Sequence, residues 1–105
     1  MRAYRLVACF TLLLAGTALA SVGATVDQKN FAFSVDTVTV HKGDSIVFTN
    51  SDRTPHNILI KSGGMLQNSG VQKPGEDVSV LFDKAGAFDV MCGIHPKMKM
   101  TVVVE

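Results

Sequence analysis

Tryptophan is absent from this 105-residue chain, and its one tyrosine, Tyr4, lies near the N-terminus. An excess of charge of either sign is also lacking, because 10 Lys and Arg stand against 9 Asp and Glu. The chain therefore has no basic surplus to hold a nucleic-acid backbone. Charged residues make up only 18% and hydrophobic residues 47%, which argues against intrinsic disorder. The length allows one domain and excludes a multidomain enzyme or a repeat array.

The N-terminal segment has the pattern of a secretory signal peptide. Two arginines fall within the first five residues, an apolar run covers 6–16, and small residues follow in Ala18-Leu19-Ala20. The apolar run is too short to span a bilayer. We therefore expect residues 1–20 to be a signal peptide cleaved before Ser21, and residues 21–105 to form a single domain.

The small number of cysteines suggests a metal site. Of the two cysteines, Cys9 lies inside the predicted signal peptide, so only Cys92 stays in the secreted domain. One cysteine cannot form an internal disulfide, whereas a small secreted domain usually needs a disulfide, a metal or a partner for stability. A lone thiol in an oxidising compartment therefore suggests a metal ligand.

Short apolar runs dominate the rest of the sequence, and several of them alternate apolar with small or polar residues. They occur at 31–35, 38–40, 46–48, 57–60, 78–82, 88–90 and 101–104, separated by residues that favour turns, with 62–75 as a long loop. No segment has a helical period. The pattern predicts about seven strands in an all-β, antiparallel Greek-key β-sandwich. A metal-free, immunoglobulin-like structural module would have the same strands but would leave Cys92 unexplained.

Four residues have side chains that commonly bind metals, and three of them lie together shortly before the last apolar run. Cys92, His95 and Met98 follow one another at intervals of three residues, and His56 lies upstream in Thr54-Pro55-His56-Asn57. One thiolate, two imidazoles and a weak thioether are the ligand set of a blue-copper electron-transfer site. The thioether could also come from Met100, two residues further on.

These motifs resemble the cupredoxins, the type 1 blue copper proteins, and among them the amicyanin and plastocyanin-like members. The resemblance runs over nearly all of residues 21–105. It rests on the order of the segments Thr37–Val40, Lys42-Gly43-Asp44, Thr49-Asn50, Pro55-His56-Asn57, Lys84-Ala85-Gly86, Cys92–Met98 and Val102–Glu105. The spacing Cys-x-x-His-Pro-x-Met before the last strand is highly specific.

The resemblance implies a role for each residue of the site. His56, Cys92 and His95 would be the equatorial copper ligands and Met98 the axial one, since Met98 fits the short amicyanin-type loop. Met100 fits a longer loop and is the alternative. Three further residues would support the site. The Asn57 amide would donate to the thiolate, and the Asn57 side chain would tie the two ligand loops together. The Ile94 amide could also donate to the sulfur, and Pro96 would form a docking patch with Pro55 and Met98.

The resemblance also implies the activity. We expect a periplasmic, monomeric protein that binds one copper ion, has no catalytic residues, and shuttles one electron between transient partners such as a periplasmic dehydrogenase and a c-type cytochrome. Nucleic acid and membrane are not expected partners. The alternative is a periplasmic copper carrier or chaperone, which would use the same residue types to deliver the metal.

Overall fold

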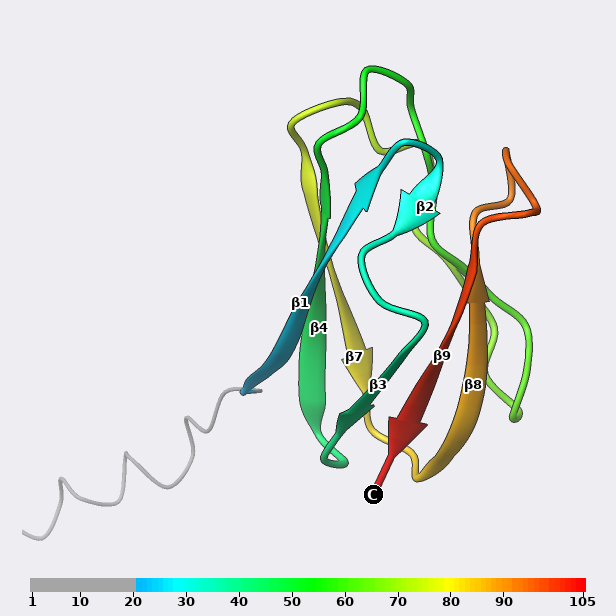
Figure 1. Ribbon diagram of the computed structural model, residues 1–105. Helices are drawn as coiled ribbons and strands as arrows, with labels where there is room; N and C mark the ends of the chain where they lie inside the picture. The colour runs from blue at the N-terminus through cyan, green and yellow to red at the C-terminus, as the bar shows by residue number, and fades with distance from the viewer. Residues whose placement is uncertain (1–20) are drawn as a thin grey trace, which may run out of the picture.

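The computed structural model describes residues 21–105, which form nine strands in two sheets (Figure 1). The strands are β1 (Val22–Lys29), β2 (Ala32–Phe33), β3 (Thr37–Val40), β4 (Asp44–Asn50), β5 (Leu59–Ile60), β6 (Gln67–Asn68), β7 (Asp77–Phe82), β8 (Gly86–Met91) and β9 (Lys99–Val104). The predicted signal peptide, residues 1–20, lies outside the described residues. Within 21–105 no helix is long and apolar enough to cross a bilayer.

The two sheets have the strand orders β2-β1-β4-β7 and β3-β9-β8-β5-β6. The expected all-β sandwich is therefore confirmed, but its sheets are mixed and not purely antiparallel. Strand β1 runs parallel to β4, and β3 runs parallel to β9. The reason is that β2 and β3 intervene between β1 and β4 along the chain, so β1 and β4 are not joined by a tight hairpin.

The core fills the space between the sheets with the alternate side chains of each strand. Phe48 on β4, Phe82 on β7 and Phe88 on β8 are at most 1% exposed, and apolar residues of β9 complete the layer. Successive residues of a strand point to opposite faces, so the period of two in the sequence becomes one buried face per sheet. This core fixes the strand ends that carry the site.

Several segments differ from the strand expectation: β1 is not among the expected runs, and β6 lies within the expected long loop 62–75. The apolar run 57–60 contains only the two-residue strand β5, and 31–35 contains only β2. Phe31, expected within a strand, lies instead in the two-residue turn between β1 and β2, whose flanking pairs are Gln28 with Phe33 and Lys29 with Ala32. This turn lies at the same end of the sandwich as the loops after β4 and β8, opposite the C-terminus (Figure 1).

Candidate metal centre

Strand register brings the two ligand loops together. Strand β5 pairs antiparallel with β8, with Leu59 opposite Met91 and Ile60 opposite Val90. Continuing that register past the end of β8 places Asn57 beside Gly93, and the Gly93 N–H donates to Asn57 Oδ1 at 2.6 Å. The loop before β5 and the loop after β8 are thereby joined, although 35 residues separate Asn57 from Cys92.

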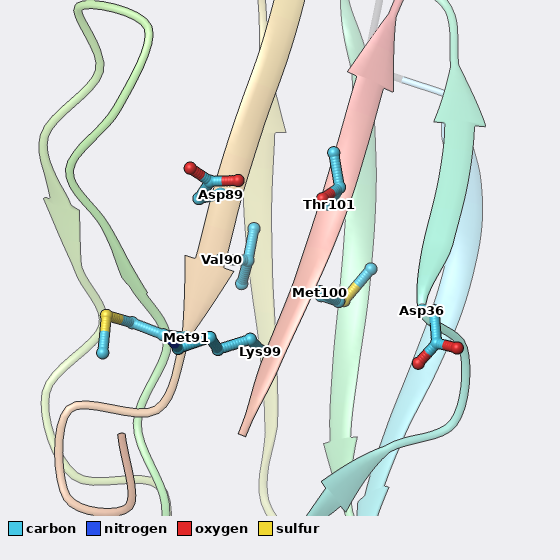
Figure 2. A pocket seen from close by; sticks show the side chains of 7 residues that line it. All are labelled: Asp36, Asp89, Val90, Met91, Lys99, Met100 and Thr101. Carbon is cyan, nitrogen blue, oxygen red and sulfur yellow. The ribbon is translucent and has the colours of Figure 1, made fainter. Parts of the chain in front are cut away.

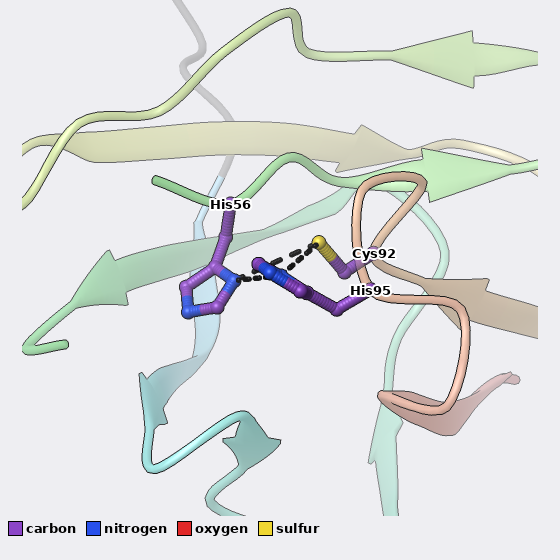
Figure 3. A group of neighbouring side chains, drawn as sticks. All are labelled: His56, Cys92 and His95. Carbon is purple, nitrogen blue, oxygen red and sulfur yellow. Dashed lines mark hydrogen bonds between the residues drawn. The ribbon is translucent and has the colours of Figure 1, made fainter. Parts of the chain in front are cut away.

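Three donor atoms converge between these loops (Figure 3). Nδ1 of His56 and Nδ1 of His95 are 3.1 Å apart, and the Cys92 sulfur lies 3.7 Å from the first and 3.8 Å from the second. His56 and Cys92 are fully buried, and His95 is half-buried. The structure thus brings together the three residues predicted as equatorial ligands.

The triangle has the size that a metal needs. A point equally distant from the three atoms lies about 2.1 Å from each, close to the bond lengths of nitrogen and sulfur ligands to zinc, about 2.0 to 2.3 Å. A trigonal site of two imidazoles and one thiolate is the donor set of blue copper. The residues present therefore fit a copper ion.

Asp52 sets which nitrogen of His56 faces the site. Its Oδ2 lies 2.9 Å from His56 Nε2, and a carboxylate can only accept, so Nε2 carries the proton and Nδ1 keeps its lone pair for a metal. The hydrogen bond from the Phe31 N–H, followed by the bond from His56, lowers the pKa of Asp52. The carboxylate is therefore charged at neutral pH.

The Cys92 sulfur receives one backbone donor. The Asn57 N–H lies 3.5 Å from Sγ, as expected, and the Asn57 Nδ2 donates to Asn68 Oδ1 at 3.2 Å. The second bond that the Ile94 amide could donate to this sulfur is not among the hydrogen bonds of residues 21–105. Ile94 lies on the outer part of the loop and is 46% exposed.

The two candidate axial methionines lie in different surroundings. Met98 is buried in the ligand loop, where its N–H donates to the His95 carbonyl at 2.9 Å and its carbonyl accepts from the Cys92 N–H at 3.2 Å. Met100 belongs to β9, pairs with Val90, and lines a hollow of about 410 Å³ along β8 and β9 (Figure 2). The backbone of Met98 is therefore hydrogen-bonded to both ligand residues of its loop, whereas Met100 lies in the strand that follows.

A second hollow, of about 430 Å³ and mainly apolar, adjoins His95. Its lining residues are Phe31, Ile94, His95, Pro96, Lys97 and Met98. Pro96 and Met98 belong to the expected docking patch, whereas Pro55 is not among the lining residues. The hollow exposes part of the loop that carries His95.

A network of buried polar side chains is hydrogen-bonded to the backbone of the loop that carries His56. The backbones of His56 and Gln72 exchange two hydrogen bonds, of 3.0 and 2.7 Å. The Gln72 side chain donates to the Phe48 carbonyl at 2.9 Å and accepts from Gln28 at 2.8 Å. Asn50 adds bonds to the carbonyls of Thr54 and Gln72. These contacts restrain the backbone around His56.

Sequence reasoning misses two residues of the site, Asp52 and Phe31. Asn50-Ser51-Asp52 indicates only the end of a strand, although an acidic residue four positions before a candidate histidine ligand is a usable signal for an orienting carboxylate. Phe31 gives no signal, because its place beside the histidines comes from the turn between β1 and β2.

Comparisons with known proteins agree on the kind of site. The sequence profile described as copper binding proteins, plastocyanin/azurin family, matches residues 20–105. Amicyanin-alpha of Methylorubrum extorquens is 34% identical over 105 residues, covering 90% of this chain and 87% of that protein. The chloroplastic plastocyanin of Tetradesmus obliquus is 32% identical, covering 85% of this chain and 67% of that protein. The solved structure of a reduced amicyanin with one substitution superimposes with a TM-score of 0.73 at 28% identity, covering 87% of this chain and 88% of that one.

Proposed function

Since the chain belongs to the plastocyanin/azurin family of copper-binding proteins, we propose that it is a secreted blue copper protein that carries one electron at a time between redox partners. The observation that supports this best is the convergence of His56, Cys92 and His95 on one point. Copper is the cofactor that this family and this donor set call for. His56, Cys92 and His95 would hold it, with Met98 as the weak axial ligand.

The residues around the ligands are suited to electron transfer because they keep the ligands in one arrangement. When bound, copper supplies a one-electron couple between Cu(I) and Cu(II). Asp52 fixes the orientation and tautomer of His56, and the Asn57 N–H withdraws charge from the Cys92 sulfur. The bond from Gly93 to Asn57 ties the two loops together. Ligands that are held in this way move little when the charge of the site changes.

His95 is the residue through which electrons would enter and leave. It is the only half-buried member of the His56, Cys92 and His95 set, and an apolar hollow adjoins it. A small apolar surface around Pro96 suits weak, transient binding of a redox protein. A periplasmic dehydrogenase as donor and a c-type cytochrome as acceptor would fit this role, with the protein acting as a monomer and not as an enzyme.

The proposed location follows from the sequence. Residues 1–20 would direct the chain to the periplasm and be removed, and residues 21–105 would fold there as one domain. N-terminal sequencing of the protein purified from the periplasm of an expressing bacterium tests this. A mature N-terminus at Ser21 is expected, and an intact Met1 in a cytoplasmic fraction would contradict it.

Loading the purified protein with Cu(II) and recording its visible absorption and EPR spectrum tests the function. An intense band in the red with narrow copper hyperfine splitting is expected, and Cys92→Ser should abolish it. His95→Ala should change the spectrum, whereas the matched control His41→Ala should not, since His41 is exposed and outside the donor cluster.

Repeated reduction and oxidation in the presence of a Cu(I) chelator separates the shuttle from the carrier. A shuttle keeps its copper through many cycles, with full return of the absorption band. Stoichiometric loss of copper in the first reduction would contradict the proposal and favour a copper carrier.

A further inference from the structure

The turn between β1 and β2 has a backbone that its sequence does not favour. Asn30 has a φ of 53° and Phe31 a φ of 59°, so two successive residues without glycine are left-handed. The type I′ form of a two-residue turn between antiparallel strands needs this conformation, and Asn-Gly is its preferred pair. Asparagine tolerates it, but a bulky aromatic residue rarely adopts it. A phenylalanine in place of the expected glycine therefore needs a compensating interaction.

One carboxylate oxygen supplies that interaction and links the turn to the metal centre. Asp52 Oδ2 accepts the Phe31 N–H at 3.0 Å and the His56 Nε2–H at 2.9 Å. Asp52 is itself fixed, because its own N–H donates to Asn50 Oδ1 at 2.9 Å. The turn and the histidine are thus held by the same atom.

The result is an aromatic ring against both histidines. The ring of Phe31 lies 4.8 Å from that of His95 and 5.9 Å from that of His56, centroid to centroid, with interplanar angles of 86° and 87°. These are edge-to-face contacts, the favourable geometry for aromatic pairs. The Phe31 side chain is still 52% exposed, so it lies between the half-buried His95 and solvent.

We propose that Phe31 is a positioning residue of the metal centre: the Asp52-held turn keeps its ring against His95, restraining that imidazole and shielding the metal from water and competing ligands. This inference rests on the proposed function, in that the metal is the copper of an electron-transfer site. It accounts for an aromatic residue at a backbone position that favours glycine, and for an apolar side chain left half in solvent.

The test compares copper retention in three variants made in the full chain. Phe31→Gly is the test variant, because it removes the ring and supplies the residue that the turn favours. Phe31→Tyr is the first control and keeps the ring. Leu81→Ala is the second control and removes an apolar side chain on β7 that is 46% exposed. Each copper-loaded protein is reduced, and the loss of Cu(I) to bathocuproine disulfonate is timed. Phe31→Gly should lose copper about tenfold faster or more, as removal of outer contacts to metal ligands does. The other two should stay within about twofold of the parent, by the same reasoning. A rate for Phe31→Gly within about twofold of the parent would overturn the inference.

Thermal unfolding of the metal-free proteins separates positioning from general stability. Phe31→Gly removes the unfavourable backbone conformation, so its Tm should lie within about 3 °C of the parent although its copper is lost faster. A fall of Tm by about 10 °C or more would overturn the positioning role, because copper loss would then follow global opening.

A copper-independent measurement tests the link through Asp52. In the metal-free protein the Phe31 amide should be protected from hydrogen exchange despite its exposed side chain, and Asp52→Ala should remove that protection. Exchange of this amide at the unprotected rate in the parent would overturn the inference. Absence of the thiolate-to-copper band in the parent protein would instead defeat the proposed function, and this hydrogen-exchange result would still stand.

Discussion

Replacing Asp52 by asparagine should raise the reduction potential of the copper site, because it removes a negative charge behind His56. The carboxylate lies 2.9 Å from Nε2, on the opposite side of the imidazole from Nδ1, which faces the metal position. With the ring included, the charge is about 7 Å from that position, where two unit charges interact by about 0.6 kcal/mol in water and about 2.4 kcal/mol at an effective dielectric constant near 20. A negative charge stabilises Cu(II) over Cu(I), so its removal favours reduction.

The size of the shift follows from this interaction. A one-electron couple moves by about 59 mV for each 1.4 kcal/mol, so the two limits correspond to roughly 25 and 100 mV. The Asp52 side chain is only 12% exposed, which places the effective dielectric constant between the limits. We expect an increase of about 50 mV, with asparagine still able to accept the bonds from Phe31 and His56.

Redox titration of the visible band measures this potential directly. Asp83→Asn is the matched control, since it removes the same charge from the turn between β7 and β8 at the other end of the sandwich. Beyond a Debye length of about 8 Å that charge is screened, and its removal should leave the potential nearly unchanged. An unchanged or lower potential in Asp52→Asn, with an intact spectrum, would refute the assignment of Asp52 as the charged partner of His56.

Three further predictions concern the axial ligand, the buried network and acid stability. Met98→Ala should shift the reduction potential and the spectrum, because it removes the axial ligand. Met100→Ala should leave the spectrum unchanged and lower the free energy of unfolding by about 2 to 5 kcal/mol, as truncation of a core residue does. The opposite pattern would assign the axial position to Met100. Gln72→Leu should cost about 2 to 4 kcal/mol in urea unfolding of the metal-free protein, because buried hydrogen-bonding groups lose their partner; a cost below about 1 kcal/mol would mean that the network adds little. Burial raises the pKa of Asp27, but the hydrogen bonds to its carboxylate, from the hydroxyls of Thr49 and Ser51 and from the backbone, together lower it by more, so the folded pKa lies below 3.8. Its stabilisation is therefore present above about pH 4 and lost as the pH falls through the folded pKa, and Asp27→Asn should flatten the decline of stability in acid, followed by circular dichroism; an unchanged slope would contradict this.

The amino-acid sequence alone determined the parts of the site that are local in the chain. Cys92, His95 and Met98 lie within one loop, so their spacing limits how far apart they can be and reveals their chemistry. The apolar period of two determined the sandwich, because each strand needs one buried face. Asn57 is predictable through its neighbour His56, and the contacts of Asn57 with Cys92 and Gly93 agree with the expected role.

Tertiary structure alone decided the long-range relations. The pairing of β5 with β8 sets how His56 meets Cys92, and it depends on register between distant segments. The parallel pairs of β1 with β4 and of β3 with β9 follow from the order in which the chain crosses between sheets. Phe31 became part of the site only because the turn of the first hairpin reaches Asp52 in the loop after β4, 21 residues along the chain. The apolar period of a strand and the spacing of residues within one loop carry no information about such contacts, because whether distant segments meet depends on how the whole core packs.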